Sequence, residues 1–159
     1  MYAELSRHAR RATLAVVCLA TAMLMLDIAV VNVALPYMAR DLHSGTAGLQ
    51  WVADGYTLAL AAVVLSAGSA ADRLGRRRVF TTGLTVFTAA SATCGLAGSV
   101  VLLDAARAVQ GLAAALMLAS SLAILADAFP AARERAGAMA AYGATIGFAF
   151  AVVRRSAGS

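Results

Sequence analysis

Three charged residues stand inside long apolar stretches of this sequence, where the two aspartates could bind and release a proton and the arginine could pair with them. Asp27 interrupts the first apolar stretch, and Asp104 and Arg107 interrupt a later one. A carboxylate costs about 2.5–3.5 kcal/mol to place inside a membrane, so it usually faces a bundle interior or a water-filled cavity. If Asp27 pairs with Arg107, both stay ionised, and protonation of the aspartate would release the arginine. The pair therefore indicates either a proton switch or a static ion pair that joins two helices.

The sequence offers Arg107 a second acidic partner. Asp104 lies three residues before it, and residues at this spacing are neighbours on one helix face. The alternative interpretation of Asp104, and of Asp54, is a charge at the membrane interface. Asn32 follows Asp27 by five residues, so the two side chains point about 140° apart on a helix. Asn32 therefore fits a helix-packing contact as well as a ligand contact.

The segments that carry these residues are predicted to be membrane-spanning helices. Hydrophobic residues make up 62% of the 159 residues and charged residues 13%, with a mean hydropathy of +0.80. Soluble proteins carry about 25% charged residues, so this composition excludes a soluble globule and a disordered chain. The expected fold class is all-α, a polytopic bundle of four or five transmembrane helices. The predicted spans are 12–38, 49–71, 79–98, 101–128 and 136–153.

The placement of the arginines predicts the orientation of the bundle. All 13 basic residues are arginine, and they exceed the 8 acidic residues to give a formal net charge of +5. Arginine clusters precede the first span and follow the second and fourth, whereas the opposite loops hold Arg40 alone. The positive-inside rule then places residues 1–11 in the cytoplasm and the chain in the plasma membrane. The lipid bilayer is thus an expected partner, and nucleic acid is not.

Motifs of enzymes and metal centres are missing from the sequence. It contains no P-loop, no Gly-x-Ser-x-Gly and no His-Glu metal motif, so no enzyme, metal site or bound cofactor is expected. Cys18 and Cys94 lie in apolar runs and are interpreted as small buried residues. Gly143 and Gly147 have the small-xxx-small spacing that allows close helix packing, and Gly111 is given the same role on the fourth span.

Three segments together resemble the major facilitator superfamily, and within it the fourteen-helix drug:proton antiporters. Residues 26–36 (Leu-Asp-Ile-Ala-Val-Val-Asn-Val-Ala-Leu-Pro) are similar to that branch's span-one motif. Residues 68–78 (Gly-Ser-Ala-Ala-Asp-Arg-Leu-Gly-Arg-Arg-Arg) are similar to the superfamily's loop signature between spans two and three. Residues 107–111 (Arg-Ala-Val-Gln-Gly) are similar to the span-four motif. The order and spacing of the motifs hold over roughly residues 12–150.

The resemblance implies proton-coupled multidrug efflux, in which the proton gradient supplies the energy and amphipathic, drug-like molecules are exported. It assigns a proton-coupling and substrate-cavity role to Asp27, Asn32, Arg107 and Gln110. It assigns a cytoplasmic gate motif to Gly68, Asp72, Arg73, Gly75, Arg76 and Arg77. In physical terms, Gly68 permits close packing and Asp72 can cap a helix start. Asp54 and Asp104 depart from the family's pattern, which usually has uncharged residues there.

The resemblance covers less than one half of such a transporter, so a C-terminal half is needed and the fragment is expected to be inactive. The family's fifth span ends in Gly-Pro-x-x-Gly-Gly, whereas residues 153–159 read Val-Arg-Arg-Ser-Ala-Gly-Ser. The family motif can be written in GC-rich codons such that deletion of one guanine shifts the reading frame. The shifted frame then encodes the tail of this chain. Residues 154–159 are therefore interpreted as an aberrant tail of a frameshifted copy. The alternatives are a small oligomeric exporter and a non-transporting partner of another membrane complex.

Overall fold

Helices account for the regular structure in the described part of the chain. The computed structural model describes residues 6–41 and 46–156, with side chains at 6–31, 51, 54–149, 151 and 152. The helices in these ranges are α1 (Arg7–Asp41), α2 (Thr46–Leu74), α3 (Arg76–Gly95), α4 (Val100–Ala128) and α5 (Ala132–Ser156). The predicted all-α fold is confirmed. The predicted tail 154–159 begins within α5, and 157–159 lie outside the described residues.

Three stretches within the described helices are long and apolar enough to cross a membrane. They are Arg7–Val31, Asp54–Leu74 and Val100–Ala128. They correspond to the predicted first, second and fourth spans. The predicted spans 79–98 and 136–153 fall on α3 and α5 and stay predictions as membrane crossings.

Threonines make α3 less apolar than its neighbours, yet they fit a helix in a dry environment. Each threonine hydroxyl of this group donates a hydrogen bond to the backbone carbonyl four residues earlier in the same helix. These residues are Thr81, Thr85, Thr88 and Thr93. The helix therefore satisfies these polar groups without a partner from another element.

Gly75 forms the junction between α2 and α3. Its backbone has φ 95°, a conformation that residues with a Cβ rarely adopt, so glycine is required there. Gly75 is also the N-cap of α3, and no side chain hydrogen-bonds to that cap. The expectation that Asp72 caps a helix start is therefore wrong. Asp72 lies in the last turn of α2, because α2 continues to Leu74 before the chain turns.

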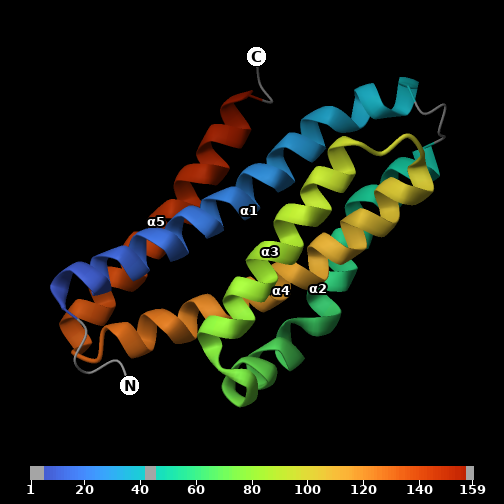
Figure 1. Cartoon of the computed structure of the whole chain (residues 1–159). Helices are drawn as coiled ribbons and strands as arrows, with labels where there is room; N and C mark the ends of the chain where they lie inside the picture. Colours follow the sequence, from blue (N-terminus) through green and yellow to red (C-terminus); the bar gives the residue numbers. More distant parts are fainter. Residues whose placement is uncertain (1–5, 42–45, 157–159) are drawn as a thin grey trace.

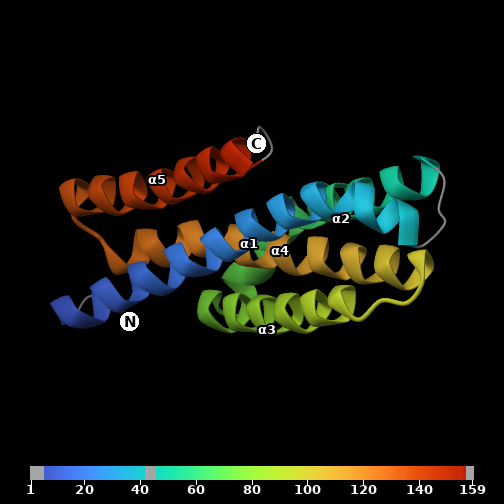
Figure 2. The same cartoon turned by 90° about the horizontal axis from the view of Figure 1, so that it is seen from above.

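The helix α4 lies at the centre of the bundle. It packs most extensively against α2 and α3, whereas α1 packs chiefly against α5 and also contacts α4. Figure 1 shows α5 beside α1. In Figure 2, α5 and α3 lie on opposite sides of the molecule, with α1, α2 and α4 between them. This arrangement lets side chains of α1, α2 and α3 all reach the same segment of α4.

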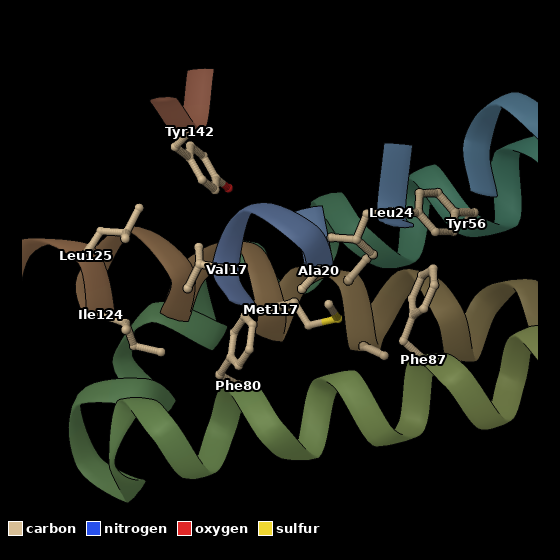
Figure 3. Close-up of a cluster of buried hydrophobic side chains, with 12 residues drawn as sticks. Val17, Ala20, Leu24, Tyr56, Phe80, Phe87, Met117, Ile124, Leu125 and Tyr142 are labelled. Atoms are coloured by element: carbon tan, nitrogen blue, oxygen red, sulfur yellow. The ribbon is translucent and has the colours of Figure 1, made fainter. Parts of the chain in front are cut away.

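The apolar core follows from this arrangement, because α4 is its largest contributor. Figure 3 shows Phe80 and Phe87 pointing from α3 toward α4 and α1, near Met117 of α4. Small residues of α4 such as Ala113 and Ala114 are almost fully buried, which lets the neighbouring helices approach closely. The buried cluster comprises Val17, Ala20, Leu24, Tyr56, Phe80, Phe87, Ala113, Ala114, Met117, Ile124, Leu125 and Tyr142.

Glycines differ sharply in whether another helix lies against them. A Cβ on Gly111 would collide with the backbone carbonyl oxygen of Tyr56, so α2 and α4 are in contact through their backbones at this point. Gly83 of α3 lies in a tight contact with α4, where a Cβ would be 3.0 Å from the backbone oxygen of Ala113, and the sequence did not reveal this contact. The close packing expected at Gly143 and Gly147 is wrong for the contacts within this chain. A Cβ at either position would meet no described atom within 4 Å, because both face away from the neighbouring helices.

Candidate functional site

Asp27 of α1 and Arg107 of α4 meet in a closed ring of hydrogen bonds with Gln110. Arg107 Nη1 donates to Asp27 Oδ2 at 2.6 Å and to Gln110 Oε1 at 2.9 Å. Gln110 Nε2 donates to Asp27 Oδ1 at 2.9 Å. Arg107 and Gln110 lie three residues apart, so one face of α4 presents both side chains to α1. Each oxygen of the Asp27 carboxylate therefore accepts a hydrogen bond from α4.

The ring is enclosed by two further helices. The Arg107 guanidinium lies over the aromatic ring of Tyr56 from α2, 4.4 Å from its centroid. Cys94 of α3 donates from Sγ to Gln110 Oε1 at 3.2 Å. The side chains of Arg107 and Asp27 are only 3% and 13% exposed, and Gln110 is fully buried. Burial strengthens the attraction between the charges, and it makes loss of either partner costly.

The structure resolves which aspartate pairs with Arg107. The partner is Asp27, whereas the Asp104 Oδ1 atom is buried with no hydrogen-bond partner among the described residues. Asp54 is exposed on α2. Asn32 belongs to α1, but its side chain lies outside those that the structure describes. Of the predicted coupling residues, Asp27, Arg107 and Gln110 are thus brought together.

A second cluster joins α2, α3 and α4 through Arg76. Its Nε and Nη2 atoms donate to Asp72 Oδ1 at 3.0 and 2.9 Å, and its Nη1 donates to Asp127 Oδ1 at 2.7 Å. Nη1 also donates to the backbone carbonyl of Ala123 at 3.2 Å. The hydrogen bond to Asp72 is the main cause of the raised pKa of Arg76, and Asp127 raises that pKa further. Arg76 therefore acts as a permanent cation that ties the ends of three helices together.

Asp127 is a member of this cluster that the sequence analysis missed. The available signal was its position three residues before Pro130, at the same end of the bundle as the arginine clusters. A second ion pair was also missed: Arg10 of α1 donates to Glu134 of α5 at 3.0 Å. Both pairs join segments that are distant in the sequence, so neither spacing nor periodicity could predict them.

The other residues of the gate motif lie in the last turns of α2, at the junction and at the start of α3. Gly68 faces open space, since a Cβ there would meet no described atom within 4 Å, and the expectation that it permits close packing is wrong within this chain. Arg73 is exposed in the last turn of α2, and Arg77 is exposed in the first turn of α3. Within the motif, Asp72 and Arg76 are joined to each other by an ion pair.

The ion pairs of Arg76 are expected to contribute little to stability, and unequally. Asp72 is 62% exposed and Asp127 35% exposed. We expect Asp127→Asn to lower the free energy of unfolding by up to about 1 kcal/mol and Asp72→Asn by less, because water screens exposed pairs. Unfolding in mixed micelles at low and high salt measures this. The Asp127→Asn loss should shrink in high salt, and a loss that salt leaves unchanged would contradict the electrostatic explanation.

Comparison with known proteins places this bundle in a family. Residues 17–158 match the Major Facilitator Superfamily. The chain belongs to the Major Facilitator Superfamily. The motifs that resembled this superfamily in the sequence include Asp27, Asp72, Arg76 and Arg107, which the fold brings into the two clusters. This superfamily consists of membrane transporters, so the chain belongs to a transporter family.

Relatives of this major facilitator chain are drug and antibiotic exporters. It is 46% identical over 117 residues to the multidrug resistance protein Stp of Mycobacterium tuberculosis, covering 74% of this chain and 22% of Stp. It is 44% identical to the drug efflux pump JefA of the same organism, covering 74% and 23%. It is 41% identical over 141 residues to a probable actinorhodin transporter of Streptomyces coelicolor, covering 88% and 24%. The matched region is thus less than a third of each relative's length.

Proposed function

We propose that this chain forms the N-terminal part of a proton-coupled drug exporter. The observation that carries the proposal is the buried ring of Asp27, Arg107 and Gln110, which places a carboxyl group in contact with a guanidinium inside the helix bundle. Relatives named as multidrug resistance and efflux proteins support the drug class. The substrates are amphipathic, drug-like molecules, and the energy comes from the proton gradient with no bound cofactor.

In this proposal, Asp27 binds either a proton or a cationic drug. An ionised Asp27 balances the charge of Arg107, and a proton on Asp27 removes that balance. A cationic drug that approaches Asp27 competes with the same proton for the same carboxylate. Because one carboxylate cannot hold both, uptake of a proton favours release of the drug. This exclusion is the physical basis for exchanging one against the other.

The proposed orientation places the N-terminus and the Arg76 cluster in the cytoplasm. The Arg76 cluster lies at the bundle end where α2 ends and α3 begins, among the arginines that the positive-inside rule keeps on that side. There it would form part of the cytoplasmic gate in the plasma membrane. The chain spans about a quarter of the length of the relatives compared above, and we propose that transport requires the remainder of such a transporter.

A chimera tests the proposal. The region of Stp that aligns with this chain is replaced by the chain's own residues, and efflux of a fluorescent cation is measured in drug-sensitive cells. We expect the chimera to export and Asp27→Asn to abolish the proton-dependent part of export. The control is Asp54→Asn, which changes an exposed carboxylate and should leave export intact.

Two results would count against this assignment. Export by the Asp27→Asn chimera at the rate of the parent chimera would remove Asp27 from proton coupling. Proton-dependent export by the chain expressed alone, together with a defined homo-oligomer, would favour a small oligomeric exporter instead.

A further inference from the structure

Two buried polar atoms of α4 lack partners, and they lie one helical turn apart. Asp104 Oδ1 and Arg107 Nε are both buried without a hydrogen bond to any described residue. One is an acceptor and the other a donor. Residues at positions i and i+3 are neighbours on a helix surface, so the side chains of Asp104 and Arg107 are within reach of each other. Buried polar groups are normally paired, so this unused pair needs an explanation.

Asp104 shares its surroundings with the Asp27–Arg107 ring. A Cβ on Gly55 of α2 would lie 3.9 Å from the backbone carbonyl of Asp104. The next residue of α2, Tyr56, supplies the aromatic ring beneath the Arg107 guanidinium. Two consecutive residues of α2 therefore face Asp104 and Arg107. Asp104 is half-buried in this interface, rather than fully exposed as a purely interfacial charge would be.

We propose that Asp104 is a second carboxylate of this site, which binds Arg107 when Asp27 is protonated. The proposal rests on the proton coupling proposed above. When a proton binds Asp27, the buried guanidinium loses its counter-ion, and Asp104 is the acidic side chain one turn away on the same helix. The O–H bond of the Asp104 carboxyl group breaks as an O–H bond forms on Asp27. This transfer conserves the single proton and the zero net charge of the site, and the proton taken up from solution binds Asp104 after the transfer.

Among the side chains that the structure describes, the other titratable groups around the ring do not offer Arg107 a carboxylate. Tyr56 of α2 and Cys94 of α3 face the ring as a phenol and a thiol. Asp54 of α2 is exposed. Asp104 also lies about 4.5 Å nearer than Arg107 to the start of α4, at a rise of about 1.5 Å per residue. It is therefore the carboxyl group that a proton entering from that end of the helix meets before Asp27.

A double-mutant cycle on the full chain tests the proposal without requiring transport. Asp27→Asn mimics the protonated aspartate, and the unfolding equilibrium constant is measured in bicelles. In the parent chain, Asp104→Asn should change this constant by less than about threefold, since Asp104 has no partner there. In the Asp27→Asn background, Asp104→Asn should raise it at least about tenfold, because it removes the remaining counter-ion of Arg107. The same factor in both backgrounds would overturn the proposal.

An infrared measurement distinguishes this switch from a purely structural role. The carboxyl band of Asp104 is assigned by subtracting the spectrum of Asp104→Asn. We expect a protonated carboxyl group in the parent chain and a carboxylate in Asp27→Asn. An Asp104 band that Asp27→Asn leaves unchanged would overturn the proposal even if a double variant failed to fold. Asp54→Asn serves as the matched control. It should change the unfolding equilibrium constant by the same factor in the parent chain and in Asp27→Asn. Failure here would leave the chimera result on Asp27 standing, so the two proposals fail separately.

Discussion

Arg107→Met is expected to lower the free energy of unfolding by about 3–5 kcal/mol, the largest effect of any single substitution considered for this chain. Arg107 is 3% exposed, and its removal leaves the Asp27 carboxylate buried without its cation. Gln110 Oε1 also loses one of its two donors and keeps the one from Cys94. An uncompensated buried charge is far less favourable than a pair, because water cannot replace the lost partner. Unfolding by a denaturing detergent in mixed micelles measures the loss.

A second substitution shows whether the loss comes from the stranded charge. Adding Asp27→Asn to Arg107→Met removes that charge and keeps an amide oxygen that can accept from Gln110 Nε2. We expect this double variant to recover at least half of the lost stability. The control Arg133→Met changes an exposed arginine and should stay within about 0.5 kcal/mol of the parent. No recovery in the double variant would mean that Arg107 acts mainly through packing on Tyr56.

Gly111→Ala is expected to destabilise the bundle by about 2–3 kcal/mol, although alanine is the better helix former. Its Cβ would collide with the Tyr56 carbonyl oxygen and lie 3.0 Å from the Ala59 Cβ. The obstacle is backbone, so it cannot move aside as a flexible side chain would. The helices α2 and α4 must separate instead, which would also move the Tyr56 ring away from Arg107. The same unfolding assay measures the effect.

Gly143→Ala is the matched control for this prediction. Gly143 lies within α5, and a Cβ there meets no described atom within 4 Å. We expect this variant to be unchanged or stabilised by up to about 1 kcal/mol, because alanine lowers the entropy cost of helix formation. Equal losses at Gly111 and Gly143 would show that the contact of α2 with α4 is not what limits substitution.

Amino-acid composition and local pattern sufficed for several properties of this protein. Few charges and long apolar runs predicted an all-α membrane bundle, because a membrane requires backbone groups to be satisfied within each helix. The predicted spans 79–98 and 101–128 leave a short turn between them, and α4 does begin at Val100 with Ser99 as its N-cap. The motifs around Asp27, Asp72 and Arg107 predicted the superfamily. These features depend on residues that lie close together in the sequence, so they can be inferred from the sequence alone.

Tertiary structure alone decided which charges meet and which glycines are in contact. Spacing left open whether Arg107 pairs with Asp27 or with Asp104, and the fold pairs it with Asp27 while Asp104 Oδ1 has no partner among the described residues. Sequence spacing also did not reveal the ion pair of Asp127, because its partner Arg76 lies on another helix. Helical periodicity shows which residues share a face, but it does not say which helix lies opposite that face. That choice depends on how α1, α2 and α3 pack around α4, and so it sets the chemistry of the site.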